Sequence, residues 1–204
     1  MTDARPTARL EALSDGVFAI AMTLLILDVR LPSTAGITGT AELWGALGHL
    51  APSVFAFVLS FGIILITWVS HHATLALVDR SSARFIYANG FLLLTVVAVP
   101  FTTGLLGDFL GTDHAGPAVV LYNAVLAVQA IGWILVDGAA LKDRLATGEW
   151  AIAMLRNGRR NGYVAALFYA LLAVAALRAP VASALVTTVS WIFWLILGIR
   201  MQRA

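Results

Sequence analysis

The sequence predicts an all-α, polytopic membrane protein whose single domain, residues 1–204, crosses the bilayer with six helices. Of its residues, 60% are hydrophobic and only 12% are charged, whereas soluble domains usually carry about 25% charged residues. The mean hydropathy is +0.90. Six apolar stretches are bounded by charges, Pro or Gly, and most approach the roughly 20 residues that a spanning helix needs. They cover residues 10–31, 43–69, 85–106, 118–136, 163–177 and 181–199.

The first stretch is too polar to be an ordinary lipid-facing span. Its uninterrupted apolar run, Gly16 to Leu27, has twelve residues, which is roughly 18 Å of helix and shorter than a hydrocarbon core of about 30 Å. Extending it to a full span adds Glu11, Asp15 and Asp28. Because acidic residues inside membranes usually face a bundle interior or an aqueous cavity, this helix is expected at the centre of the assembly.

Helical geometry separates the residues of the first helix into two faces. At about 100° per residue, Ile20, Thr23, Leu24 and Leu27 fall within one wedge, and Asp15 lies on the far side of the helix. Ordinary helix packing produces the same pattern. The spacing alone therefore does not indicate a pore.

A second polar feature is the motif TWVSHH at the end of the second stretch. Trp68 and His72 lie four residues apart, on one face of a helix. With the first helix running outward and the second returning, this motif reaches the level of Arg9, Ser14 and Asp15. The two polar groups are therefore expected to meet.

The remaining stretches carry weaker signals. Pro100 is expected to kink or unwind the third helix, and Asn89 in that helix could hydrogen-bond across the bundle. The tight turn at Arg178 joins the fifth and sixth helices. Residues 142–162 are predicted to form a basic cytoplasmic loop with a short amphipathic turn on the membrane surface.

The distribution of basic residues predicts the orientation. With the N-terminus in the cytoplasm, only Arg30 and Arg178 of the thirteen Lys and Arg residues lie outside. The positive-inside rule therefore places both termini in the cytoplasm. The inner residues are Arg5, Arg9, Arg80, Arg84, Lys142, Arg144, Arg156, Arg159, Arg160, Arg200 and Arg203.

The composition also argues against several functional classes. The sequence has no cysteine, and its formal charge of +2 is not gathered in one basic patch, so nucleic acid is not an expected partner. His71 and His72 are adjacent and point about 100° apart on a helix, which disfavours a metal site. No hydrolase triad, phosphate loop or HExxH motif is present. We therefore expect no enzyme activity, metal or cofactor.

The segment RLEALSD, Arg9 to Asp15, followed by GVFAIAMTLLIL, resembles the RxxxFSD signature of the transmembrane protein 175 family of lysosomal and bacterial potassium channels. TWVSHH and the run LLLTVVAVPFTTGLL in the third helix also look like that family. The resemblance covers about the first 110 residues. Leu13 stands where the family signature has Phe.

The resemblance implies a homotetramer whose four first helices line a pore for potassium and other monovalent cations. The positions that match the family's hydrophobic constriction are Ile20, Leu24 and Leu27, and Thr23 matches a layer linked to potassium preference. The TVGYG carbonyl filter is absent from the sequence, so weak potassium selectivity is expected. The bacterial members place such a chain in the cell membrane.

The resemblance also implies that five polar residues form one structural hydrogen-bond network. They are Arg9, Ser14, Asp15, Trp68 and His72. A rival hypothesis uses Asp15 and His72 as a proton relay in a proton-coupled secondary transporter or proton leak pathway. No pair of broken helices in matching halves supports a transporter, and no residues support a non-conducting scaffold.

Overall fold

The structure, a computed structural model, describes residues 7–30 and 32–203, with the side chains of residues 35 and 197–203 not included. Arg5 and Leu31, used in the sequence predictions, lie outside the described residues, as do the side chains of Arg200 and Arg203. All regular elements in the described part are helical, which confirms the all-α class.

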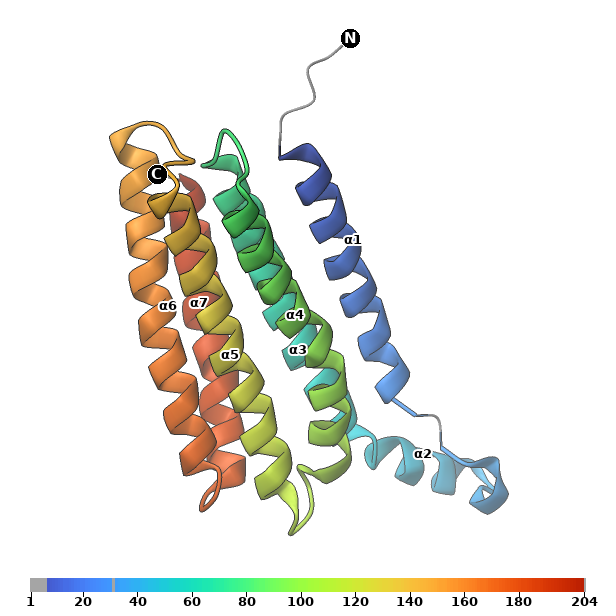
Figure 1. Cartoon of the computed structure of the whole chain (residues 1–204). Coiled ribbons are helices and arrows are strands. Elements are labelled where there is room, and N and C mark those ends of the chain that lie inside the picture. The colour runs from blue at the N-terminus through green and yellow to red at the C-terminus, as the bar shows by residue number, and fades with distance from the viewer. Residues whose placement is uncertain (1–6, 31, 204) are drawn as a thin grey trace.

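Long helices alternate in direction along the chain (Figure 1). They are α1 (Ala8–Leu24), α3 (Ala51–Ala76), α4 (Ala83–Phe109), α5 (Ala115–Lys142), α6 (Glu149–Ala175) and α7 (Pro180–Arg203). The shorter elements are η1 (Leu25–Asp28), η2 (Thr34–Gly36) and α2 (Thr40–Gly48). We call the end of the bundle where α1 begins the N-terminal end; α7 ends at this end too (Figure 1).

Four of these helical segments are long and apolar enough to cross a membrane. They are Ala8–Asp28, Ala51–Ala76, Ala83–Phe109 and Ala115–Lys142. In α7 the described apolar part, Pro180–Ile196, is shorter. The chain therefore has the helices of a multi-pass membrane protein, and the number of six crossings stays a prediction.

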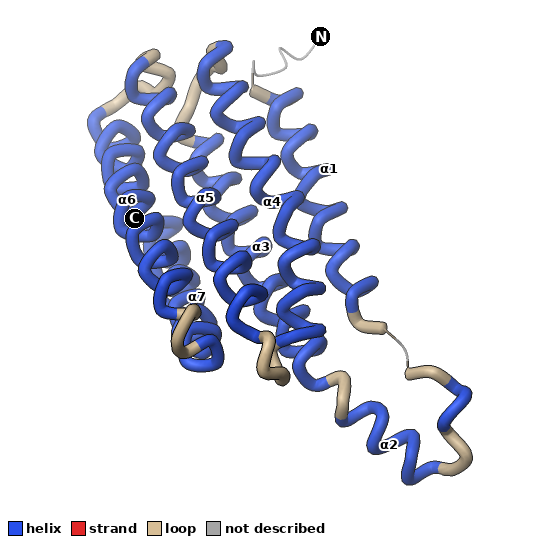
Figure 2. Tube along the Cα trace, turned by 60° about the horizontal axis from the view of Figure 1, so that its bottom comes forward, coloured by secondary structure: helices blue, strands red, loops and turns tan. Residues whose placement is uncertain are grey.

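The predicted stretch 43–69 is not one helix. It is divided between α2, which ends at Gly48, and α3, which begins at Ala51. Pro52 occupies the first turn of α3, where its missing N–H costs no helical hydrogen bond, whereas further inside a helix it would. Figure 2 shows α2 projecting from the bundle at the end opposite the N-terminal end.

The prediction that residues 142–162 form a loop is wrong. Helix α6 begins at Glu149 and continues to Ala175. Ala151, Leu155 and Gly162 are buried, at spacings that place them on one face of a helix, and α6 packs extensively on α5. The intervening arginines are exposed on the other face. The amphipathic first half of α6 therefore extends this helix toward α5. The loop between Lys142 and Glu149 is only a few residues long.

Helix α4 occupies a central place and packs on α1, α3 and α5. It continues past Pro100, and it ends at Phe109. Two glycines allow neighbouring backbones to approach it closely. A Cβ on Gly107 would lie 2.9 Å from Ser53 Cα of α3, and a Cβ on Gly132 of α5 would lie 3.1 Å from Leu92 Cα.

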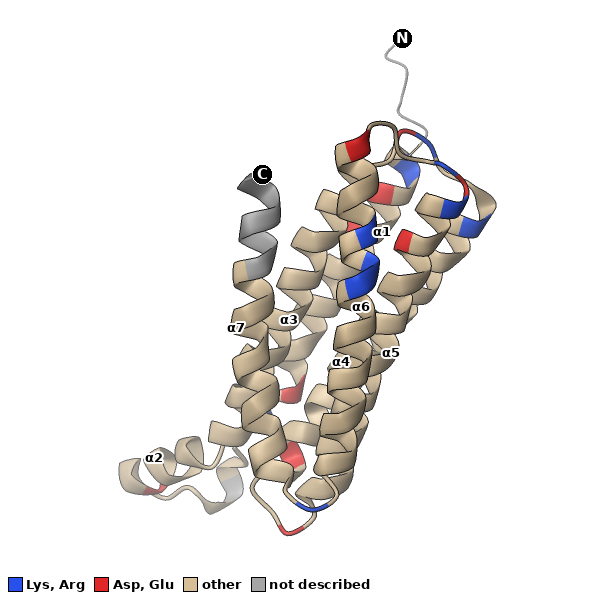
Figure 3. Ribbon diagram, turned by 90° about the vertical axis from the view of Figure 1, so that its left-hand side faces the viewer, with Lys and Arg blue, Asp and Glu red and all other residues tan. Residues whose placement is uncertain are grey.

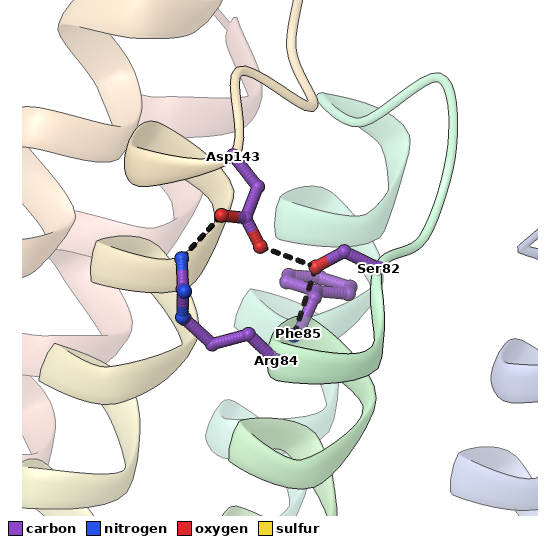
Figure 4. A network of polar contacts seen from close by, with 4 residues as sticks. All are labelled: Ser82, Arg84, Phe85 and Asp143. Carbon is purple, nitrogen blue, oxygen red and sulfur yellow. Dashed lines mark hydrogen bonds and ion pairs between the residues drawn. The ribbon is translucent and has the colours of Figure 1, made fainter.

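Basic residues gather at the N-terminal end of the bundle and along the first half of α6 (Figure 3). There the loops before α4 and after α5 are joined (Figure 4). The Ser82 hydroxyl accepts a hydrogen bond from Phe85 N at 3.2 Å and donates to Asp143 Oδ2 at 2.6 Å. Arg84 pairs with the same carboxylate. These contacts cap α4 and hold it against the end of α5.

Candidate functional site

One face of α1 is packed into the bundle. Leu10, Ser14, Phe18 and Ala21 are buried, and Leu25 continues this face into η1. Phe18 and Leu25 have no exposed surface. Their cluster includes α3 and α4 residues, namely Ile64, Leu93, Val96 and Val99. α1 is therefore held to α3 and α4 by apolar burial along its whole length.

The opposite face of α1 is open. Ile20 is 60% exposed, Leu24 is 43% exposed and Leu27 is 70% exposed. Thr23 is exposed between them, and its hydroxyl donates to the Ile20 carbonyl at 2.9 Å. We call these four residues the α1 stripe. In the single chain α1 lies at one edge of the bundle (Figure 1), so no other helix among the described residues covers the stripe.

Two polar pairs join α1 to α3 near the N-terminal end. Trp68 Nε1 donates to Asp15 Oδ1 at 2.8 Å. His72 Nδ1 lies 3.5 Å from Glu11 Oε1, and both side chains of that pair are substantially exposed. The Trp68 and His72 rings are neighbours, with centroids 6.3 Å apart. Asp15 is therefore directed toward α3 and not into the α1 stripe.

A separate hydrogen-bonded chain lies in the interior between α1, α4 and α3. Asn89 Nδ2 donates to the Ser14 hydroxyl at 3.1 Å, and Ser14 donates to the Leu10 carbonyl at 2.8 Å. Asn89 Oδ1 lies 2.6 Å from His71 Nε2. Since the amide oxygen can only accept, His71 carries its proton on Nε2 in this arrangement.

The implied five-residue network is thus divided in the structure. Asp15 and Trp68 are in contact, Ser14 belongs to the interior chain, and His72 faces Glu11. Arg9 is exposed and makes no hydrogen bond or ion pair within the described residues. His71, the residue that completes the interior chain, was not among the expected site residues. Its signal in the sequence was only its place beside His72.

Within the described part of the chain, no group of three or more His, Cys, Asp or Glu side chains is placed to hold a metal ion. The α1 stripe instead offers apolar side chains and one hydroxyl layer. Such a surface binds no ion tightly, but four copies around an axis could form a narrow apolar passage.

Known channel proteins share sequence with this chain. The family model of the endosomal/lysosomal potassium channel TMEM175 matches residues 9–100. A potassium channel of Chamaesiphon minutus is 44% identical over 140 residues, which are 68% of this chain and 68% of that protein. A potassium channel of Streptomyces collinus is 43% identical over 143 residues, or 67% of this chain and 68% of that one. The endosomal/lysosomal proton channel TMEM175 of Gallus gallus is 32% identical over 127 residues, 60% of this chain and 25% of its own.

Solved structures also match nearly the whole chain. The crystal structure of a lysosomal potassium-selective channel TMEM175 homologue from Chamaesiphon minutus superposes with a TM-score of 0.84 at 33% identity. The superposition covers 94% of this chain and 97% of that one. A T38A variant of the potassium channel MtTMEM175 shares the fold, with a TM-score of 0.64 at 20% identity over 95% of this chain and 89% of that chain.

Proposed function

This chain belongs to the TMEM175 family, and we propose that it forms a homotetrameric, potassium-permeable cation channel whose constriction is the α1 stripe. The observation that carries the proposal is the open face of α1, where Ile20, Leu24 and Leu27 are exposed although the opposite face is packed. Relatives named as potassium channels support potassium as the permeant ion.

The ends of α1 argue for its burial in an assembly. Glu11 and Asp15 lie near one end of the segment and Asp28 at the other. Their side chains contact α3 or α4 on one side but stay partly exposed, so in a single chain at the edge of the bundle they would adjoin lipid, where an acidic side chain is costly. Further copies around the stripe would replace lipid with protein and a water-filled path. A homotetramer with α1 at its centre is the assembly implied by the resemblance in sequence.

The chemistry of the stripe supports gating by pore width and weak selectivity. A ring of Leu or Ile offers no ligands that replace an ion's water, so a tight ring dewets and a slightly wider one conducts. Thr23 differs from its neighbours because its hydroxyl proton is engaged by the Ile20 carbonyl. A lone pair of its oxygen is then free for a passing cation. One hydroxyl layer would discriminate potassium from sodium only modestly.

The contact between Asp15 and Trp68 suits a structural role. The hydrogen bond of 2.8 Å from Trp68 Nε1 to Asp15 Oδ1 would fix the rotation of α1 relative to α3. It would thereby fix the direction in which the stripe points. We place Ser14 and His72 in the same supporting role, through their contacts to Asn89 and Glu11, whereas Arg9 has no such contact within the described residues. We further propose that both termini lie in the cytoplasm of a bacterial cell. The basic side chains at the N-terminal end of the bundle support this orientation (Figure 3).

Proton permeation is a second candidate function. Relatives from Gallus gallus and Bos taurus are named proton channels, and Asp15 and His72 lie at the same end of the bundle near Glu11. A proton path through these residues predicts current that follows the pH gradient and persists when potassium is replaced by a large organic cation.

The test is single-channel recording of the purified chain in planar bilayers. Ile20→Ala and Leu24→Ala should raise the unitary potassium conductance, since each substitution widens a ring of the stripe. Leu167→Ala is the matched control, because Leu167 is 63% exposed on α6, away from α1. Unchanged conductance in both stripe variants would refute the constriction, and the absence of unitary steps from the wild type would refute the channel.

A further inference from the structure

A cavity of about 160 Å³ lies between α3, α5, α6 and α7. No residue of the α1 stripe lines it. Its size corresponds to the volume of roughly five water molecules in the liquid, at about 30 Å³ each.

Helix α5 supplies a line of functional groups to this cavity. Gln129, Trp133 and Asp137 all line it, and their spacing of four residues places them on one face of the helix. The first and last of them are separated by roughly 12 Å along the axis, at 1.5 Å per residue. Trp191 and Trp194 of α7 line the same cavity.

The two polar members of this line are buried, and one of them has a polar atom without a partner. Gln129 is 5% exposed, and its Nε2 makes no hydrogen bond within the residues that the structure describes. Asp137 is 2% exposed and likewise has no hydrogen bond or ion pair there. Buried polar groups in native proteins are almost always satisfied. The unpartnered Gln129 Nε2, in the same cavity as a buried carboxyl group, therefore marks this cavity as a candidate ligand site.

The surroundings of Asp137 preserve room for its carboxylate. A Cβ on Gly158 of α6 would lie 2.5 Å from Asp137 Oδ2, so any larger residue there would displace the carboxyl group from its present position. The Arg159 side chain is exposed, and its Cδ passes beside Gly138, the residue that follows Asp137. It forms no ion pair with Asp137 among the described contacts. The carboxylate thus lacks a direct counter-ion.

We propose that this cavity binds a small organic ammonium ion with an apolar body. Asp137 is the counter-ion, Trp133, Trp191 and Trp194 form aromatic walls, and the Gln129 amide donates to an acceptor on the ligand or to a water beside it. A buried carboxylate that stays ionised requires a positive partner, and aromatic faces attract organic cations. A hard metal cation is a poorer fit, because it needs about six oxygen ligands and this site offers one carboxylate.

The test uses phenethylamine and 2-phenylethanol, which differ mainly in the ammonium group. Each is titrated at neutral pH into the full chain in lipid nanodiscs, and binding is followed by tryptophan fluorescence. Phenethylamine should bind saturably and at least tenfold more tightly than the alcohol. Equal binding of the two compounds to the wild type, or no saturable binding of phenethylamine, overturns the proposal without any variant.

Substitutions then locate the site. Asp137→Asn should weaken phenethylamine binding at least tenfold and abolish its advantage over the alcohol. Asp113→Asn, the same change on an exposed loop residue, should leave both affinities unchanged. Arg159→Gln should tighten amine binding, because it removes a competing positive charge. Trp194→Leu, which leaves the carboxylate in place, should weaken binding severalfold. Undiminished amine binding by either Asp137→Asn or Trp194→Leu, as for an amine in the channel pore, overturns the proposal.

Discussion

The interior chain of Ser14, Asn89 and His71 offers the sharpest test of what holds α1 in place. Asn89→Leu removes the amide at the centre of this chain and keeps a side chain of similar size. The variant loses the contact of 3.1 Å to Ser14 and the contact of 2.6 Å to His71. Ser14 can still donate to Leu10, but the Nε2 proton of His71 is left without an acceptor in a residue that is 2% exposed.

The magnitude follows from the cost of buried unpaired groups. An orphaned buried donor costs about 1–3 kcal/mol, so Asn89→Leu should lower the free energy of unfolding by about 2–3 kcal/mol. His71→Leu orphans the amide oxygen of Asn89 and should cost a similar amount. The double variant replaces both groups with apolar ones. It should therefore cost less than the sum of the single variants, by about 1–2 kcal/mol of coupling.

The assay is reversible SDS unfolding in mixed micelles, followed by circular dichroism, for the wild type and the three variants. Thr95→Val is the matched control, because Thr95 is also buried in α4 and its hydroxyl donates to Leu92 of its own helix. It should show no coupling to His71→Leu. If the costs of Asn89→Leu and His71→Leu add to within about 0.5 kcal/mol, the assignment of this chain as a cross-helix clamp is refuted.

Three further predictions use other contacts. Gly107→Ala should destabilise the fold by about 1–3 kcal/mol, because the new Cβ would meet the Ser53 backbone. Gly90→Ala has open space around it and should stabilise the fold by up to about 1 kcal/mol. Equal unfolding midpoints for the two variants would contradict this prediction. Ser82→Ala should cost about 1 kcal/mol and speed amide exchange in the first turn of α4; unchanged exchange would mean that the cap is unimportant. Asp15→Asn should lower the melting temperature of the assembly and leave the potassium-to-sodium permeability ratio unchanged, and a changed ratio in an intact assembly would contradict its structural role.

The helical class and most of the helices could be predicted from the sequence, because hydropathy reports where a segment can reside in a membrane. Two segments differ from the prediction because a single local signal does not determine where a helix begins. The apolar character of residues 43–69 indicated one continuous helix, but a new helix begins at Ala51, with Pro52 in its first turn. The charged residues of 142–162 indicated a loop, but Ala151 and Leu155 have helical spacing and are buried against the bundle. A helix that is polar on one face still continues when its other face is packed on the bundle.

The two faces of α1 follow from the sequence, because the rotation of 100° per residue is a property of the helix itself. Spacing alone separated Asp15 from Ile20 and Leu24. The partners of the buried face were decided only by the tertiary structure. Ser14 meets Asn89 across 75 positions, and Gln129 and Asp137 share one cavity without meeting a partner in the described residues. Backbone hydrogen bonds within a helix are local, whereas contacts between side chains of different helices depend on how each helix is rotated and shifted along its axis against its neighbours.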